Sequence, residues 1–177
     1  MKKYELTAEF IEQWGKKLFR IKALISFGSV EAGELGGYVE KEDNLAQDGD
    51  AWVYGNARVC GDAEVYGDAR VCGNARVYGD AWVCDDARVC GDADYLLIGR
   101  IGSRFSFTTF FKNKDKGITV SCGCFLGTIA EFRAKVTDTH GNNKHAKMYN
   151  LAADMAELQI LGEEHFDKLN TNKSEPF

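Results

Sequence analysis

The apolar positions of the central stretch repeat every six residues. From Gly49 to Cys90 the chain reads GDAWVY, GNARVC, GDAEVY, GDARVC, GNARVY, GDAWVC and DDARVC, so valine and alanine each recur in a fixed register. A glycine and an Asp or Asn interrupt the units, and both residue types tolerate the left-handed backbone of a sharp corner. The pattern predicts very short strands separated by corners. It excludes a helix, because each glycine would cost about 1 kcal/mol and no apolar stripe of helical period is present.

The segment before the repeats is irregular, and we expect residues 1–42 to form an N-terminal cap. Thr7 is a candidate N-cap for a short helix over Ala8–Trp14, which Gly15 would end. The apolar run Lys16–Phe27 predicts a strand that pairs with Tyr4–Leu6. The six-residue rhythm starts imperfectly after residue 37. We place the repeat domain at residues 43–94, since terminal repeats are usually atypical.

The segment after the repeats predicts an α+β module over residues 95–161. Two β-rich runs, Phe105–Lys112 and Gly117–Phe125, flank a polar turn that ends in glycine and are expected to form a hairpin. A polar tail over residues 162–177 is expected to be mobile.

Two helices are expected between the hairpin and the tail. Thr128-Ile-Ala-Glu131 has the form of a capping box and opens a helix to about Thr139, which His140 and Gly141 end. Asn142 or Asn143 caps a second helix that runs to about Leu161. Its apolar residues at helical spacing are Met148, Leu151, Ala152, Met155 and Leu158 or Gln159.

The unit Val53-Tyr-Gly-Asn-Ala-Arg58 resembles the hexapeptide repeat of left-handed parallel β-helices. In that family three hexads make one triangular coil, and the aliphatic and small residues face inward. The resemblance implies a mostly β fold with α, in which a short left-handed parallel β-helix lies between the N-terminal cap and the C-terminal α+β module. It would have about three coils, each rising roughly 4.8 Å. Hexapeptide-repeat proteins commonly form trimers, so the resemblance also implies a homotrimer. A flattened solenoid with two hexads per turn is the alternative, favoured by the alternation of Tyr and Cys with a period of twelve.

The whole chain also resembles repeat proteins of phages, prophages and gut bacteria in the order of its segments. These segments are RIKAL at Arg20–Leu24, GELGGYVE at Gly33–Glu40, the repeats, and TTFF, SCGCF, GTIAEF and HGNNK between Ile98 and Lys144. The function of that architecture is largely unassigned, so this resemblance implies a fold rather than a chemistry.

Charge and cysteine content narrow the partners and the compartment. The net charge is −5, and residues 49–94 hold four Arg against nine Asp or Glu. Direct nucleic-acid binding is disfavoured, because passive binding along the phosphate backbone needs a basic stripe. No apolar run approaches the roughly 18 residues that span a bilayer, and the N-terminus lacks the apolar core of a signal peptide. Six cysteines without an export signal are expected to be reduced thiols in the cytoplasm, which is the bacterial host cytosol if the protein is phage-encoded.

The fourth residue of each six-residue repeat is required neither by the corner nor by the core. Trp and Arg, which dominate it, are enriched in recognition sites, where Trp stacks and Arg binds carboxylate or phosphate. With eighteen residues per coil, the Arg and Trp side chains of successive coils lie beside one another, and stacked like charges favour an anion between them. The alternative is a solvated outer face or an oligomer interface with Asp partners. The candidate ligand-binding residues of this set are Trp52, Arg58, Arg70, Arg76, Trp82 and Arg88.

A second set of candidates lies in loops and strand ends of the C-terminal module. Gly102-Ser103-Arg104 and nearby Thr hydroxyls suit a phosphate, which backbone N–H groups and a guanidinium can hold. No Walker or dinucleotide motif accompanies them, and ordinary hairpin and cap residues are the alternative. The candidates of this set are Arg100, Ser103, Arg104, Thr108, Thr109, Lys112 and His140.

Three other chemistries have weaker support. Acyltransferases of the left-handed β-helix type resemble one another in a catalytic His beside the coils, whereas His140, His145 and His165 all lie outside the repeats. Cys122-Gly-Cys124 is half of a zinc site without a clear second half, so packed thiols and no metal are expected. The Asp or Asn at the second place of each repeat is explained by the geometry of the corner. The alternative is a surface of stacked acidic side chains that binds calcium or mimics DNA phosphates.

These observations predict a homo-oligomeric binding protein without catalytic activity or cofactor. The specific hypothesis is a phage-type sponge with an anti-defence role, which sequesters a small anionic, nucleotide-derived immune signal in clefts between subunits. One alternative is a protein-interaction or inhibitor module that uses the acidic coil faces with their Trp and Arg side chains. The other is a hexapeptide-type acyltransferase.

Overall fold

The structure is a computed structural model that describes residues 1–165. The chain divides into two compact units, one spanning Met1–Asp92 and one beginning at Ala93. Most of the predicted mobile tail, residues 162–177, lies outside the described residues. The division into a cap over 1–42, repeats over 43–94 and a module over 95–161 stays a prediction.

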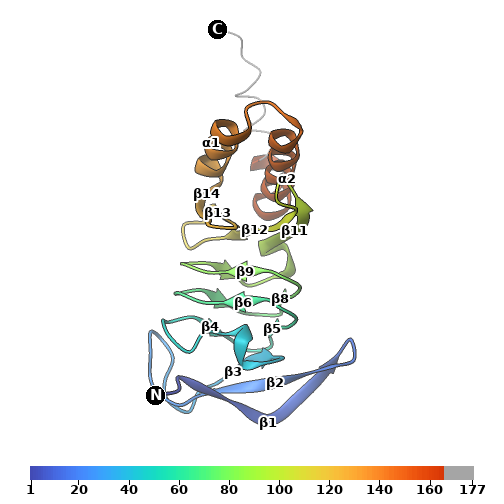
Figure 1. Ribbon diagram of the computed structural model, residues 1–177. Coiled ribbons are helices and arrows are strands. Elements are labelled where there is room, and N and C mark those ends of the chain that lie inside the picture. The colour runs from blue at the N-terminus through green and yellow to red at the C-terminus, as the bar shows by residue number, and fades with distance from the viewer. Residues whose placement is uncertain (166–177) are drawn as a thin grey trace. The chain divides into compact units, whose positions relative to one another are not determined.

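The first unit begins with a long antiparallel hairpin where the sequence predicts a helix (Figure 1). β1 (Tyr4–Gln13) pairs with β2 (Lys16–Ala23) along its length. Trp14 and Gly15 have φ angles of 52° and 74°, and positive φ at both central residues is the mark of a type I′ hairpin turn. The helix over Ala8–Trp14 is therefore a wrong prediction, because strand pairing outweighs the weak propensity of so short a helix. The predicted pairing of the second segment with Tyr4–Leu6 is confirmed.

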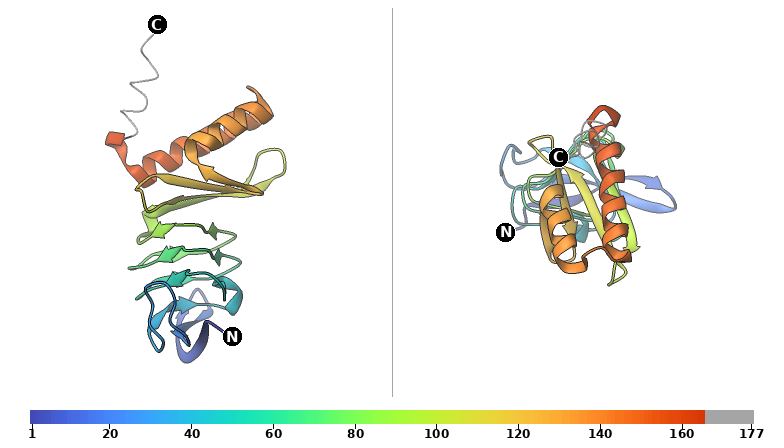
Figure 2. Two further views of the ribbon diagram at one scale, coloured as in Figure 1. Left: turned by 90° about the vertical axis from the view of Figure 1, so that its left-hand side faces the viewer. Right: turned by 90° about the horizontal axis from the view of Figure 1, so that it is seen from above.

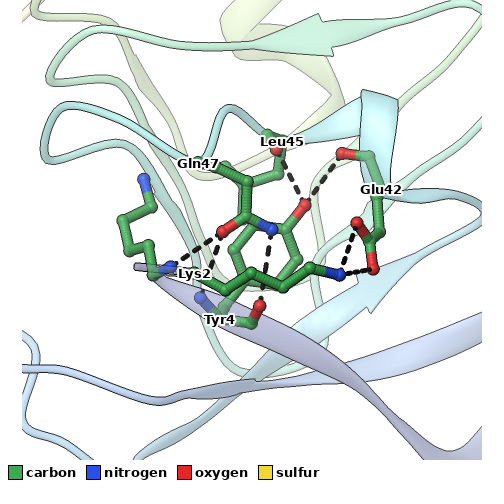
Figure 3. Close-up of polar contacts among 6 residues, drawn as sticks. Lys2, Tyr4, Glu42, Leu45 and Gln47 are labelled. Carbon is green, nitrogen blue, oxygen red and sulfur yellow. Dashed lines mark hydrogen bonds and ion pairs between the residues drawn. The ribbon is translucent and has the colours of Figure 1, made fainter.

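The start of β1 is fixed to the segment that leads into the repeats (Figure 3). The Tyr4 hydroxyl lies 2.8 Å from the carbonyl oxygen of Glu42 and 2.7 Å from that of Leu45. The Gln47 side chain accepts a hydrogen bond from the backbone N–H of Tyr4, and the Lys2 ammonium forms an ion pair of 2.7 Å with Glu42. These contacts join residues more than 35 positions apart and close the N-terminal end of the unit.

Lys3 is a buried ammonium group that satisfies backbone acceptors. Lys3 is 2% exposed. Its Nζ donates hydrogen bonds to the carbonyl oxygens of Asp48, Gly49 and Ala51 at 3.1, 3.3 and 3.0 Å. The Phe27 ring lies 4.9 Å from the same nitrogen. Burial lowers the pKa of the Lys3 ammonium. The contacts explain how a lysine is accommodated in the interior at the first repeat.

Each repeat contributes one strand of two residues. The Val of every strand and the Ala two positions before it are buried. The glycines at the corners, from Gly49 to Gly79, all have positive φ, and Asp85 adopts the same conformation (φ 55°) in the seventh repeat, where it replaces glycine. The strands are β4 (Trp52–Val53), β5 (Arg58–Val59), β6 (Glu64–Val65), β7 (Arg70–Val71), β8 (Arg76–Val77), β9 (Trp82–Val83) and β10 (Arg88–Val89).

These strands pair in parallel with the strand eighteen residues away. Arg58 lies opposite Arg76, and Arg70 lies between Trp52 and Arg88. This spacing corresponds to three hexads and not to the two hexads of the flattened alternative.

The predicted regular left-handed parallel β-helix is nevertheless not found in residues 1–165, and this part of the fold class is wrong. The strands belong to small separate sheets: a mixed one of order β1-β2-β3-β5-β8, which includes β3 (Leu35–Val39), and two parallel ones of order β10-β7-β4 and β6-β9. Two-residue strands cannot build a long ladder, and the β1–β2 hairpin turns the largest sheet into a mixed one. Two 3₁₀ turns, η1 (Glu42–Asn44) and η2 (Asp92–Asp94), flank the repeats.

Between residues 93 and 165 the second unit contains an antiparallel sheet and the helices α1 and α2. The sheet has the order β11 (Tyr95–Ile101), β12 (Ser106–Lys112), β13 (Ile118–Cys122) and β14 (Phe125–Thr128). The predicted hairpin is confirmed by the pairing of β12 with β13. Figures 1 and 2 show both helices on one face of this sheet. The core of this unit includes Phe110, Val120 and Phe132.

The two helices begin and end where the sequence predicts. α1 (Ile129–His140) starts at the capping box of Thr128 and Glu131, and α2 (Lys144–Leu161) starts at Asn143, whose side chain accepts from the backbone N–H groups of His145 and Ala146. No helix within residues 1–165 is both long and apolar enough to cross a membrane.

The side of α2 that packs on the core is not the side that holds its large apolar side chains. Of the predicted apolar positions, Ala152 is buried, whereas the larger side chains Met148, Leu151, Met155 and Leu158 are exposed. The small alanines allow the helix to approach its neighbours closely. The buried residues of α2 are Ala146, Tyr149, Ala152, Ala153, Ala156, Glu157 and Ile160.

Candidate ligand-binding site

A pocket of about 300 Å³ lies within the second unit. It is bounded by the loop between β11 and β12, the turn between β13 and β14, and side chains of α1 and α2. Its volume falls at the lower end of the range for small-molecule sites. The lining residues are Ser103, Arg104, Cys122, Cys124, Phe125, Phe132, Lys135, Val136, Thr139, His140 and Tyr149.

Aromatic rings form one wall of the pocket. The ring centroids of Phe132 and Tyr149 are 5.6 Å apart, and those of Phe125 and Phe132 are also 5.6 Å apart. The Tyr149 hydroxyl lies against Gly102, where a Cβ would overlap it. Burial and, after it, the Cys122 thiol raise the pKa of the Tyr149 hydroxyl. Tyr149 therefore stays protonated at neutral pH and can donate a hydrogen bond.

The Arg104 guanidinium lies over the turn between β13 and β14. A Cβ on Gly123 would come within 2.8 Å of Arg104 Nη2, and Gly123 has a φ of 61°. The turn has two residues because Cys122 pairs directly with Phe125. The positive charge of Arg104 acts on the Tyr149 hydroxyl and opposes the rise in its pKa. Glycine in the turn thus leaves room for a cation beside the aromatic wall.

α1 supplies two further basic side chains to the pocket, Lys135 and His140. The His140 ring stacks on the Tyr149 ring, with centroids 5.8 Å apart and planes inclined by 26°. The His145 ring lies 5.7 Å from that of His140. Lys135 is exposed at the pocket, with its Nζ 3.6 Å from a carboxylate oxygen of Asp138.

The pocket therefore combines basic groups with an aromatic wall. Arg104 and Lys135 are cations, His140 adds an imidazole ring, and none of the lining residues described above is acidic. Arginine binds phosphate and carboxylate through two parallel hydrogen bonds, and aromatic rings bind flat apolar groups by stacking. This combination suits a small anion that also has a flat ring.

The structure brings three of the predicted C-terminal residues together in the pocket: Ser103, Arg104 and His140. Thr108 is buried behind it, and its hydroxyl donates to the Cys122 sulfur at 3.2 Å.

The remaining C-terminal candidates do not line this pocket. Lys112 forms an ion pair of 3.1 Å with Asp94, and Thr109 is buried in β12. Arg100 is exposed in β11 and has a φ of 56°, at a break in the pairing of β11 with β12 between Ile98 and Ile101.

Of the candidates in the repeats, Trp52 and Arg88 are engaged within the fold. Trp52 is 0% exposed and packs against Tyr4 and Phe27, with ring centroids 6.0 and 5.4 Å away. The Arg88 guanidinium donates to the backbone carbonyl oxygens of Asp68, Asp86 and Ala87.

The other repeat candidates are at least partly accessible. Arg58 is half-buried and donates to the Gln13 side chain at 2.6 Å, and Arg70 is half-buried in β7. Arg76 and Trp82 are exposed.

The cysteines differ from the predicted set of six reduced thiols. Cys72 and Cys90 form a disulfide, while Cys60, Cys84, Cys122 and Cys124 are free. The pairing of Val71 with Val89 places the two cysteines that follow them side by side, with 4.4 Å between their Cα atoms. In the part of the chain that the structure describes, no three His, Cys, Asp or Glu side chains lie close enough to hold a metal ion.

Comparison with known families concerns the repeats. Residues 69–85 match the YdcK β-solenoid repeat family. The match supports a repeat of the β-helix type in this stretch, which contains β7, β8 and β9, although the structure arranges these strands in separate small sheets. In a comparison with curated proteins, no protein matches the chain significantly. The second unit, which contains the pocket, lies outside the matched residues.

Sequence reasoning missed most of the aromatic wall. Phe132 and Tyr149 lie within helices and belong to no motif that points to a site. The partner of Tyr149, Gly102, gives the better signal, because a glycine in the Gly-Ser-Arg loop marks a close approach of another side chain.

Proposed function

We propose that this protein is a binding protein without catalytic activity, and that the pocket of its second unit holds a small anionic ligand. The observation that supports the proposal is the arrangement of Arg104, Lys135 and His140 around the wall of Phe132 and Tyr149. A phosphate beside Arg104 and a flat ring against the aromatic wall would use both parts of the pocket.

The specific form of the proposal is a phage-type sponge for a nucleotide-derived immune signal. A nucleotide has the two features that the pocket suits, an anionic phosphate and a flat base. The proposal includes a homo-oligomer, with a trimer expected, in which clefts between subunits contribute to capture. A cytoplasmic location, in the bacterial host if the protein is phage-encoded, belongs to the same proposal.

Thermal unfolding of the full chain with a panel of cyclic and linear nucleotides, and with inorganic phosphate, tests the proposal. A ligand present at a hundred times its Kd adds roughly 2.7 kcal/mol to the free energy of unfolding, which is a readily measured rise in Tm. Arg104→Ala is expected to raise the Kd at least about tenfold, because a charge-assisted hydrogen bond contributes about 1.5–3 kcal/mol.

Arg76→Ala is the matched control, since it removes the same charge from an exposed position in the repeats. Binding that survives Arg76→Ala and is lost in Arg104→Ala supports the pocket. The reverse result places the ligand on the repeats, and the absence of a shift with every compound in the panel contradicts the proposal.

The second candidate function is a protein-interaction module. Exposed aromatic side chains in the first unit favour it: the Trp14 ring lies 5.6 Å from that of Tyr78, and Trp82 is also exposed. Exposed Trp and Tyr are enriched where proteins bind other proteins. Trp14→Ala would leave nucleotide binding unchanged and would weaken binding of a protein partner.

A further inference from the structure

The helix α2 has apolar side chains on two sides. One side, which includes Tyr149, Ala153 and Ile160, packs on the core of the second unit. The other side holds four large apolar side chains that remain in solvent. Their exposed fractions are 39% for Met148, 63% for Leu151, 56% for Met155 and 45% for Leu158. A surface helix ordinarily has polar residues on the side away from its core, so this second apolar side calls for a partner.

The spacing of these four residues is that of a coiled-coil seam. Met148 and Met155 are seven residues apart, and so are Leu151 and Leu158, which gives the alternating three- and four-residue steps of positions a and d. At 100° per residue the four side chains fall within an arc of about 80°. An arc this narrow is typical of a helix that pairs with one other helix.

The same spacing is symmetrical about the middle of the helix. When two copies of α2 lie antiparallel, Met148 of one faces Leu158 of the other, and Leu151 faces Met155. Each a position then meets a d position over the whole seam. The surface is therefore complementary to itself under a twofold rotation, as the interface of a symmetric dimer must be.

The charges at the ends of α2 favour the antiparallel direction. Lys144 and Lys147 are exposed in its first turn, and Glu163 and Glu164 are exposed just beyond its last residue. An antiparallel pair places the basic end of one copy beside the acidic end of the other, whereas a parallel pair places like charges together. The dipoles of the two helices also favour the antiparallel arrangement.

We propose that α2 pairs antiparallel with α2 of a second copy of this chain, through Met148, Leu151, Met155 and Leu158. The helix is already folded against its own sheet, so pairing does not have to supply the free energy of helix formation. Methionine adapts to the shape of a partner surface, which suits a short seam. Tyr149 lies on the opposite side of the helix, so this interface is independent of the proposed ligand pocket.

The mass of the particle tests the seam. Size-exclusion chromatography with light scattering, run on the full chain over a concentration series, measures this mass. The Leu151→Lys/Met155→Lys variant should have half the mass of the unaltered protein. Leu126→Lys is the matched control, because Leu126 is 48% exposed in the same unit and lies outside α2. The milder Leu151→Gln/Met155→Gln variant should show the same halving, and circular dichroism checks that both variants keep their helices.

Cross-linking tests the direction of pairing. In a Cys124→Ser background, a mixture of Met148→Cys and Leu158→Cys chains should form a mixed disulfide-linked dimer. Met148→Cys alone should not, because antiparallel pairing separates the two copies of position 148 by about 15 Å along the helix axis. A monomeric unaltered protein, a mass that the α2 substitutions do not change, or efficient cross-linking of Met148→Cys to itself would overturn the proposal.

Discussion

Gly102 lies against the pocket residue Tyr149, and one added methyl group is expected to be costly there. It has a φ of 74°, and a Cβ at this position would overlap the buried Tyr149 hydroxyl. Gly102→Ala combines backbone strain with displacement of Tyr149, and we expect it to lower the free energy of unfolding of the second unit by about 3 kcal/mol. Urea denaturation followed by far-ultraviolet circular dichroism measures the loss.

Gly141→Ala separates the two causes. Gly141 also has a positive φ, 55°, but nothing lies within 4 Å of a Cβ placed there. Its substitution adds strain alone, with an expected loss of about 1 kcal/mol. Equal losses at Gly102 and Gly141 would show that the fit of Tyr149 against Gly102 contributes nothing to stability.

At the level of single residues, the sequence indicates the polar part of the pocket better than the aromatic part. Ser103, Arg104 and His140 stand out as polar residues in loops and at a helix end. Tyr149 does not, because its place in the pocket depends on which side of α2 packs on the sheet. That side is set by three-dimensional packing and not by the residue type.

At the level of elements, the capping box of α1 gives a pH-dependent contribution to stability. The Glu131 carboxylate accepts hydrogen bonds of 2.8 Å from both the backbone N–H and the hydroxyl of Thr128, and the Glu131 N–H donates to that hydroxyl. The backbone N–H of Thr128, and then its hydroxyl, lower the pKa of Glu131 from its ordinary value of 4.5. Thr128→Ala should cost about 1 kcal/mol of stability.

The sign of the pH effect follows from the direction of that shift. Since the folded state holds the carboxylate charged, the contribution is fully present above pH 4.5 and is lost as the pH falls through the lowered folded-state value. Glu131→Gln should therefore destabilise the protein near neutral pH and have a smaller effect in acid. Urea denaturation of the unaltered protein and of Glu131→Gln, each near neutral pH and in acid, measures this difference. A destabilisation by Glu131→Gln that grows on acidification would contradict the prediction.

Capped helices are the elements that the sequence predicts best, because the cap is a local pattern. Both helix starts, at Thr128 and Asn143, follow from residues within three positions of the boundary. The second part of β1, from Ala8 to Gln13, is a strand where the sequence predicts a helix, because its conformation depends on pairing with β2 and on the left-handed turn at Trp14. A pattern that alternates only weakly does not reveal a distant partner strand.

At the level of the whole chain, the six-residue period predicts local geometry but not the sheets. The buried Val and Ala columns and the left-handed corners follow from residue type alone. The eighteen-residue pairing agrees with the three hexads that the family resemblance implies, and the six-residue period alone leaves a pairing over two hexads equally open. How the strands divide among sheets does not follow, because β2 and β3 join the repeat strands β5 and β8 from outside the repeat.

The eighteen-residue pairing also identifies one disulfide. In the column that alternates Tyr and Cys, Cys60 is eighteen residues from Tyr78 and Cys84 is eighteen from Tyr66, whereas Cys72 is eighteen from Cys90. Cys72 and Cys90 follow the paired residues Val71 and Val89, so the strand pairing brings two thiols together here. The disulfide closes a loop of eighteen residues, and loop-closure entropy predicts a stabilisation of about 3 kcal/mol.

Separate probes for the two units make this stabilisation measurable in the full chain. All three tryptophans, Trp14, Trp52 and Trp82, lie in the first unit, so their fluorescence reports its unfolding, while the circular dichroism of α1 and α2 reports the second. Cys72→Ser/Cys90→Ser should shift the fluorescence transition by about 3 kcal/mol, and reductant should bring the unaltered protein to the same midpoint. Cys124→Ser, which removes an exposed free thiol, should leave that transition in place. Six titratable thiols in the unreduced protein, or a fluorescence transition insensitive to reductant, would show that strand pairing places the two sulfurs together without forming the bond.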